Sequence, residues 1–195
     1  MMLVEKIKKD VEKKLSKDPK RLKHTFGVYE VALKLAEVYH VSKEDASIAA
    51  LFHDYMKVDD MKTQMALLSD NDIQHYQQAK VMYHALSAAK CLEKKYKIKN
   101  KDLINAVRYH VWGHKQMSLL GKIIFVSDYC EPNRDFLDTT YIYQLAVQNI
   151  DEAVLYCMKL TLDDVLRKKK MPHEDQIEAY HKMKEETDGK TTSNH

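Results

Sequence analysis

The sequence contains few residues that break helices or cross-link a chain. Its 195 residues include only 4 Gly, 3 Pro and 3 Cys, whereas Leu, Ala, Lys, Glu and Met, which favour helices, are plentiful. The cysteines, Cys91, Cys130 and Cys157, are widely spaced and form no C-x-x-C pair. This excludes a disulfide framework or a cysteine-rich zinc site as the basis of the fold, and we expect a reducing, cytoplasmic location.

The sequence also lacks a long apolar run and an excess of one charge. No stretch is long enough to cross a bilayer, and charged residues interrupt the apolar positions of the start, MMLVEKIKKDVEKKL, unlike a secretory signal. Lys and Arg number 32 against 29 Asp and Glu. The lysine run at 168–170 ends a predicted helix, where cations complement the helix dipole, although a basic patch is the alternative. We therefore expect neither a membrane nor a nucleic-acid partner.

Apolar residues recur at helical spacing, and no strand-like alternation persists, so the sequence predicts an all-α fold. Asp18-Pro19 predicts a helix start, with the helix running to about residue 39. Ser42 predicts the start of a helix to about residue 54, and Asn100 caps another. Residues 58–74 are predicted to form shorter helical pieces. We expect residues 1–188 to form one domain and the polar tail 189–195 to be disordered. Further helices are predicted at 78–95, 101–110, 118–130, 140–169 and 174–187.

Several histidines and carboxylates occupy the apolar faces of these predicted helices. His24 continues a stripe with Val28 and Val31, and Asp128 lies within the apolar run LLGKIIFVSDY. Adjacent residues on a helix diverge by about 100°, so a His-Asp pair at a helix end can serve one centre only where several helices converge. The residues with this character are His24, His53, Asp54, His84, His110 and Asp128.

A shared metal centre accounts for this set. One histidine on an apolar face is more often a hydrogen-bonded core residue, but the whole set is hard to bury without an ion. An ionised Asp128 in an apolar helix would cost several kcal/mol without a cationic partner. Imidazole and carboxylate ligands suit iron, manganese, cobalt, nickel or zinc. Two such ions about 3.5–4 Å apart can hold a bridging hydroxide and bind a phosphoryl oxygen, which is the usual arrangement for metal-assisted phosphate hydrolysis.

The order H…HD…H…H…D resembles the two-metal subset of the HD-domain superfamily of metal-dependent phosphohydrolases, and in particular the bacterial YqeK family. Stretches 21–36, 49–57, 117–136 and 171–180 carry the likeness, and SDYCEPNRDF is close to the family's ADY-IEPNRDF. The resemblance implies a single-domain, all-helical HD-domain bundle. It also implies a symmetrical diadenosine tetraphosphate hydrolase that yields two ADP with a di-iron centre.

The resemblance implies roles for individual residues. Asp54 would bridge two metals, one held also by His24, His53 and Asp128, and the other by His84 and His110. Lys57 and Arg134 would contact phosphate, which with Asp54 makes them the expected catalytic residues. The alternatives are a surface position for Lys57 and a local salt bridge from Arg134 to Asp135 or Glu131. A guanidinium fork matches phosphate oxygens, which favours the phosphate role for Arg134.

The sequence departs from the family around the expected substrate. Ala85-Leu86 follow His84 where the family has Gly-Pro, and Val111-Trp112 follow His110 where it has Thr-Thr. Trp112 either stacks on a base or packs in the core. We hypothesise that the bridging hydroxide attacks phosphorus in line while Arg134, with Lys57 or Lys115, holds the remaining phosphates. His114 either protonates the leaving phosphate or lies in a solvent-facing loop.

Three other functions stay open at this point. They are hydrolysis of a different nucleotide, dioxygen activation by a di-iron site, and nucleotide binding without catalysis. A small-molecule nucleotide is the expected partner in the first and third. The segment containing Tyr141, Ile142, Tyr143 and Leu145 either forms an exposed homodimer surface or is an ordinary core helix.

Overall fold

The computed structural model describes the backbone of residues 2–135 and 138–192, with side chains described to residue 189. All regular elements in these ranges are helical, which confirms the all-α prediction. The elements are the 3₁₀-helix η1 (Lys80–Met82) and the α-helices α1 (Met2–Leu15), α2 (Pro19–Val38), α3 (Lys43–Phe52), α4 (Met61–Met65), α5 (Asp70–His75), α6 (Tyr83–Tyr96), α7 (Lys101–Arg108), α8 (Leu119–Cys130), α9 (Thr139–Gln148), α10 (Ile150–Arg167) and α11 (Glu174–Thr192).

Short polar side chains start the helices where the sequence predicts. The Asp18 carboxylate accepts a hydrogen bond from the backbone N–H of Arg21 at 2.9 Å, with proline as the first residue of α2. The Ser42 hydroxyl accepts one from the backbone of α3 at 3.2 Å. Asn100 caps α7 by accepting from the N–H of Asp102 at 3.0 Å. These bonds satisfy amides that have no partner within the helix.

The prediction of one long helix at 140–169 is wrong, because the helix is interrupted at Asn149. This residue has an extended conformation with φ −153° and ψ 102°, and it separates α9 from α10. Its side-chain oxygen accepts hydrogen bonds from the N–H groups of Asp151 at 3.1 Å and Glu152 at 3.3 Å. An asparagine side chain competes with helical backbone bonds in this way. The break lets α9 and α10 pack against each other.

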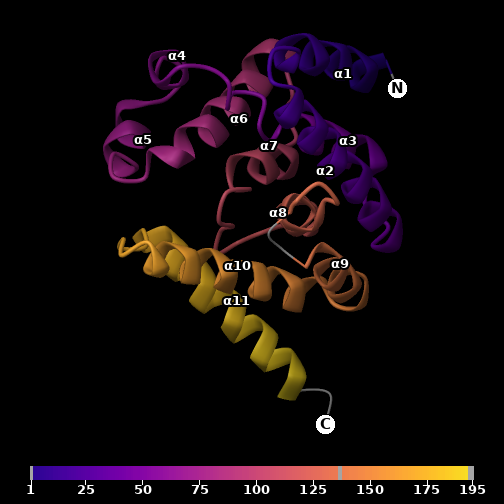
Figure 1. Cartoon of the computed structure of the whole chain (residues 1–195), viewed down its shortest axis with the longest axis vertical. Helices are drawn as coiled ribbons and strands as arrows, with labels where there is room; N and C mark the ends of the chain where they lie inside the picture. The colour runs from indigo at the N-terminus through magenta and orange to yellow at the C-terminus, as the bar shows by residue number, and fades with distance from the viewer. Residues whose placement is uncertain (1, 136–137, 193–195) are drawn as a thin grey trace.

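The arrangement of the helices defines an interior meeting point. Helices α2, α3, α7 and α8 pack against one another in the middle of the molecule, with α1 against α2 and α3 (Figure 1). Helices α4–α6 lie on one side, and α9–α11 lie at the end that carries the C-terminus. One large hydrophobic core runs through the bundle, and a smaller cluster forms under α5 and α6. Ligands from several of these helices can therefore reach one point.

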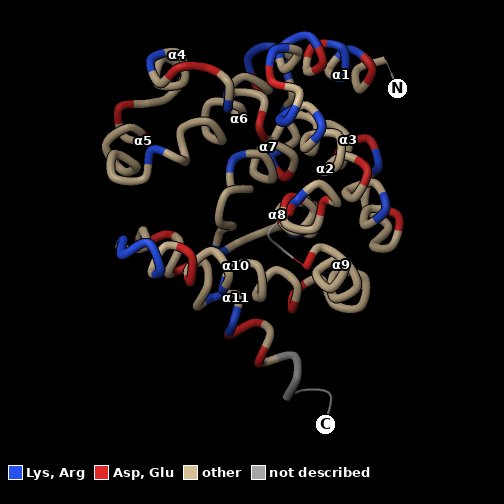
Figure 2. Tube along the Cα trace, in the orientation of Figure 1, with Lys and Arg blue, Asp and Glu red and all other residues tan. Residues whose placement is uncertain are grey.

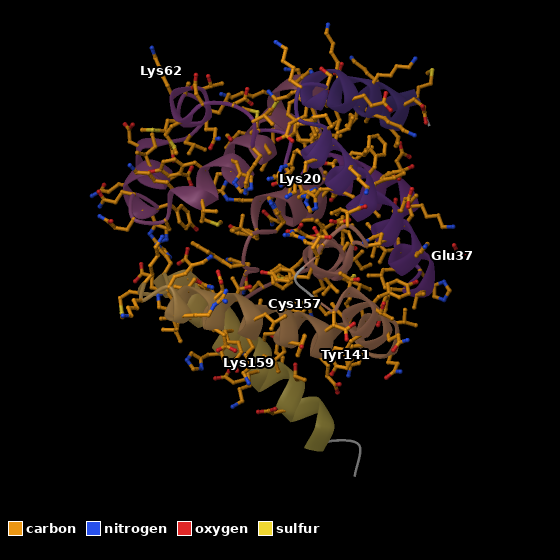
Figure 3. The ribbon with its side chains drawn as sticks, in the orientation of Figure 1. Lys20, Glu37, Lys62, Tyr141, Cys157 and Lys159 are labelled. Carbon is orange, nitrogen blue, oxygen red and sulfur yellow. The ribbon has the colours of Figure 1, made fainter. Side chains whose placement is uncertain are left out.

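The outer surface carries both signs of charge. Figure 2 shows Lys and Arg interspersed with Asp and Glu along α1, α2 and the end of α10. Lys62 projects outward, whereas Cys157 lies among packed side chains (Figure 3). All three cysteines are free, and Cys91 is the half-buried one. No helix within the described ranges is long and apolar enough to span a membrane.

Two expectations concern the C-terminal third. Of the proposed homodimer surface, Tyr141 is 46% exposed and Ile142 is buried, so α9 contributes both to the surface and to the core. We expected disorder from residue 189, but α11 continues to Thr192. Residues 193–195 lie outside the described ranges.

Candidate metal centre

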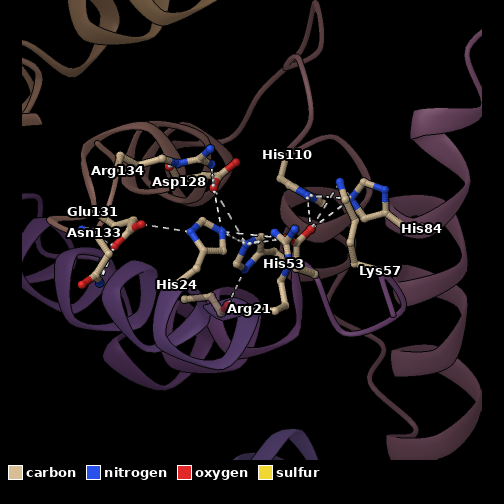
Figure 4. Close-up of polar contacts among 12 residues, drawn as sticks. Arg21, His24, His53, Lys57, His84, His110, Asp128, Glu131, Asn133 and Arg134 are labelled. Atoms are coloured by element: carbon tan, nitrogen blue, oxygen red, sulfur yellow. Dashed lines mark hydrogen bonds and ion pairs between the residues drawn. The ribbon is translucent and has the colours of Figure 1, made fainter. Parts of the chain in front are cut away.

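The six predicted ligands lie together in the interior (Figure 4). Three of them fall just beyond helix ends rather than inside helices. Helix α3 ends at Phe52 and α7 ends at Arg108, so the turns that follow aim the side chains inward. The six residues are His24 on α2, His53 and Asp54 after α3, His84 on α6, His110 after α7, and Asp128 on α8.

Asp54 lies between two groups of side chains. Its Oδ2 atom lies 3.7 Å from Nε2 of His24 and 3.8 Å from Nε2 of His53. Its Oδ1 atom faces the other way, 3.1 Å from Nε2 of His84 and 3.5 Å from Nε2 of His110.

Asp128 completes the group on the Oδ2 side. Its Oδ1 atom lies 3.1 Å from Nε2 of His24 and 4.0 Å from Nε2 of His53. One carboxylate, that of Asp54, thus offers an oxygen to each of two donor sets.

Hydrogen bonds on the outer ring nitrogens orient three of the imidazoles. His53 Nδ1 lies 2.7 Å from the carbonyl oxygen of Ala50, and His110 Nδ1 lies 2.8 Å from that of Val107. A carbonyl can only accept, so these Nδ1 atoms carry the proton. His24 Nδ1 lies 3.1 Å from the carboxylate of Glu131 in the same way. With a metal bound, each ring would present the lone pair of Nε2 to the centre, as metal-binding histidines do.

The facing nitrogens fit a cation between them. The Nε2 atoms of His24 and His53 are 3.2 Å apart, and those of His84 and His110 are 3.3 Å apart. Burial lowers the pKa of His53 to about 3 and that of His84 to about 4, so both are neutral at pH 7. Two ring nitrogens at this separation need a proton or a metal ion between them, because two bare lone pairs would repel. The donor set therefore suits divalent ions that accept imidazole and carboxylate together.

The two aspartates stay ionised despite their burial. Burial opposes ionisation of Asp54, but nearby histidines hold its pKa well below the ordinary value. Burial likewise opposes ionisation of Asp128, and the hydrogen bond with His24 and the charge of Arg134 lower its pKa. Arg134 donates from Nη2 to the Asp128 carboxylate and from Nε to its backbone oxygen at 2.9 Å. The centre thus combines the neutral imidazoles of His53 and His84 with the buried negative charge of two carboxylates, which attracts cations.

Three cationic side chains border the centre. Arg21 forms an ion pair with Asp54, and Lys57 Nζ lies 3.3 Å from Nε2 of His84. Burial lowers the pKa of Lys57 from its ordinary value. Both residues and Arg134 line a cavity of about 540 Å³ that also exposes Asp54 and Asp128. Sequence reasoning missed Arg21; its position one turn before His24 on α2 was the available signal.

Sequence reasoning also missed the support behind His24. Glu131, 1% exposed, accepts from His24 through Oε1. Its Oε2 accepts from the backbone N–H of Asn133 at 2.8 Å and from its side-chain amide at 2.7 Å. Gly27 makes room for this carboxylate, because a Cβ there would lie 2.3 Å from Oε2. The motif SDYCEPNRDF contains both Glu131 and Asn133 but does not reveal the contact.

Three expected substrate contacts lie outside the cavity over the metal ligands. Lys115 bonds to Glu178 on α11 at 2.9 Å, and the ring of His114 stacks on Tyr109 with centroids 4.1 Å apart. Neither lines the cavity over the metal ligands. Trp112 is 6% exposed in the smaller core cluster, which agrees with the packing alternative.

Comparison with known proteins agrees with this architecture. The HD domain family matches residues 21–133. A protein of Halalkalibacterium halodurans named symmetrical bis(5'-nucleosyl)-tetraphosphatase is 34% identical, covering 84% of this chain and 88% of its own length. Proteins of the same name from Bacillus subtilis and Staphylococcus aureus are 32% and 30% identical, covering 80% and 86% of this chain and 86% and 87% of their own lengths.

A solved structure has the same fold over most of the chain. The crystal structure at 1.50 Å resolution of a predicted HD superfamily hydrolase from Clostridium acetobutylicum, described as involved in NAD metabolism, aligns with a TM-score of 0.83. It is 30% identical, and the match covers 93% of this chain and 97% of that one. With its buried His and Asp cluster and these relatives, the chain belongs to the HD-domain family of metal-dependent hydrolases.

Proposed function

We propose that the protein hydrolyses diadenosine tetraphosphate symmetrically to two ADP, with two divalent ions held by the six ligands. Three relatives that align over most of their length carry the name symmetrical bis(5'-nucleosyl)-tetraphosphatase, which supports this substrate class. Iron is the metal that we propose first, because the resemblance implies it, and manganese, cobalt, nickel and zinc suit the same donors.

One observation carries the proposal of two ions. The two carboxylate oxygens of Asp54 face different donor sets, with His24 and His53 on one side and His84 and His110 on the other. A carboxylate that offers one oxygen to each set suits a bridging ligand. When bound, two such ions supply Lewis acidity toward phosphate oxygens and make water a better nucleophile near neutral pH.

The protein's own side chains bind and orient the tetraphosphate. Arg21, Lys57 and Arg134 line the cavity together with the two aspartates, so a phosphate chain there would lie among three cations. Guanidinium groups bind phosphate oxygens in pairs, and the bond from Arg134 to Asp128 fixes the direction of its side chain. Water adds to one of the two central phosphorus atoms, the central P–O bond breaks, and the leaving ADP phosphate takes up a proton from solvent.

The test is hydrolysis of diadenosine tetraphosphate by metal-free protein to which Fe²⁺, Mn²⁺ or Co²⁺ is added. We expect two ADP as the chromatographic products. AMP with ATP would contradict symmetrical cleavage. A panel of nucleoside mono-, di- and triphosphates distinguishes this activity from hydrolysis of another nucleotide, and oxygen consumption would indicate an oxygenase.

A variant of the proposed bridging residue tests the metal count. We expect elemental analysis to find two ions per chain in the wild type and fewer in Asp54→Asn. Hydrolysis should fall by more than about 100-fold, since loss of outer partners of metal ligands alone costs about 10–100-fold. Asp45→Asn, in the first turn of α3, the helix that precedes Asp54, is the control and should keep both metal and activity. Full metal content in Asp54→Asn would exclude a bridging role.

A further inference from the structure

A second large cavity opens beside the metal centre. It measures about 740 Å³ and lies between η1, the turn after α7, the end of α10 and the start of α11. This volume is within the range of sites for small organic ligands, about 300–1,000 Å³. Its lining includes Ala79, Val81, Trp112, Met171 and Gln176.

This cavity lies next to the cavity over the metal ligands. Val111, Thr161 and Asp164 line both of them. A molecule whose phosphates lie among Arg21, Lys57 and Arg134 can therefore extend past Val111 into the second cavity. The two cavities lie side by side between the buried aspartates and the start of α11.

Apolar side chains at the second cavity remain open to water. Val81 is 49% exposed and Met171 is 89% exposed. Trp112, which is 6% exposed, also lines this cavity, and its ring is stacked on His173 at a centroid distance of 5.5 Å and an interplanar angle of 18°. Exposed apolar groups that gather around a cavity indicate a site for an apolar, flat part of a ligand.

One buried polar group at this cavity has no hydrogen-bond partner. Gln176 is 3% exposed, lines the cavity, and its amide nitrogen Nε2 makes no hydrogen bond within the described residues. An unsatisfied buried donor costs about 1–3 kcal/mol. A ligand that supplies an acceptor would remove this cost, and the ring nitrogens of a purine are such acceptors.

We propose that this second cavity binds the purine base of the nucleotide substrate, with Gln176 as hydrogen-bond donor and Trp112 and Val81 as its apolar walls. The inference rests on the proposed function. Symmetrical cleavage places the central phosphates at the metal centre, so one ADP half of the bound substrate must extend away from that centre on each side. Lys80 and Lys170 line the same cavity, as do Asp164 and Glu174, and Lys168 forms an ion pair with Asp164.

The single tryptophan of the chain provides a direct readout. ADP, titrated into metal-loaded protein, is expected to change Trp112 fluorescence saturably, whereas inorganic pyrophosphate, which has no base, leaves it unchanged. In Gln176→Leu we expect ADP binding about threefold to tenfold weaker, the value of one hydrogen bond, with metal content and thermal unfolding temperature retained. Val81→Gln should weaken ADP binding and raise KM for the tetraphosphate without changing kcat.

Val147→Gln is the matched control, because Val147 is 37% exposed on α9 and does not line this cavity. It should bind ADP as the wild type does. Equal fluorescence changes with ADP and pyrophosphate, or unchanged ADP binding in both cavity variants, would overturn the inference. If the wild type still produces two ADP from the tetraphosphate in that case, the proposed function stands and only the base site fails. ADP binding as expected, without hydrolysis at any metal loading, would support the base site and contradict the proposed function.

Discussion

Replacing Gly27 with alanine should have two opposing effects: it raises the helix propensity of α2, and it disturbs the Glu131 carboxylate that holds the proposed metal ligand His24. Gly27 lies inside α2, one turn after His24. A helix interior ordinarily gains about 0.5–1 kcal/mol when glycine becomes alanine. Here the new Cβ would lie 2.3 Å from Oε2 of Glu131 and 2.9 Å from the side-chain nitrogen of Asn133.

The carboxylate has little freedom to move away. Oε2 must retreat by about 1 Å to reach 3.4 Å, where ordinary contact begins. Glu131 is buried, and its two oxygens accept three hydrogen bonds, from His24 and from the backbone and side chain of Asn133. Weakening bonds to a charged group costs about 1.5–3 kcal/mol. The net loss of stability should therefore be about 1–2 kcal/mol, despite the gain in propensity.

The effect on the metal should be larger than the effect on the fold. Glu131 fixes the proton of His24 on Nδ1, and loss of such a partner weakens metal binding about 10–100-fold. We would measure the free energy of unfolding by urea titration and metal affinity by competition with a chromophoric chelator. Gly121→Ala on α8 is the control, since its Cβ meets its nearest neighbours at 3.7 Å, an ordinary contact. A Gly27→Ala protein that is more stable than the wild type and binds metal equally well would refute the reasoning.

Three further predictions concern the rest of the fold. Burial raises the pKa of the Cys130 thiol to about 12, so at pH 8 it should react with a disulfide reagent at least about 100-fold slower in native than in unfolded protein; equal rates would contradict this. Lys122→Met removes the 2.7 Å ion pair with Asp151 and should cost about 1–3 kcal/mol in urea unfolding, whereas an unchanged midpoint would mean that the pair adds no stability. Burial opposes ionisation of Asp175, but hydrogen bonds from Tyr76 and His75 lower its pKa. The stability that ionised Asp175 contributes is therefore fully present above the ordinary aspartate pKa, and it is lost as the pH falls through the lowered pKa of the folded protein. Tyr76→Phe removes one of these hydrogen bonds, so the unfolding temperature of this variant should fall less on acidification than that of the wild type.

The helices and their starts followed from local sequence. Asp18, Ser42 and Asn100 begin helices where they were predicted, because capping depends on bonds to amides two or three residues away. The break at Asn149 was missed, since apolar spacing continues through it and an asparagine is compatible with either a cap or a helix surface.

The sequence by itself determined the helical fold and which six side chains are candidate ligands, because a polar residue on an apolar stripe is visible from spacing alone. Only the tertiary structure decided how these side chains combine. It places the two oxygens of Asp54 toward different histidines, and it places Glu131 in a hydrogen bond with His24 in the space that Gly27 leaves open. It also directs Lys115 to α11 instead of the metal centre. These contacts join residues far apart in the chain. Their distances depend on how the helices pack, and no local pattern of residues encodes that.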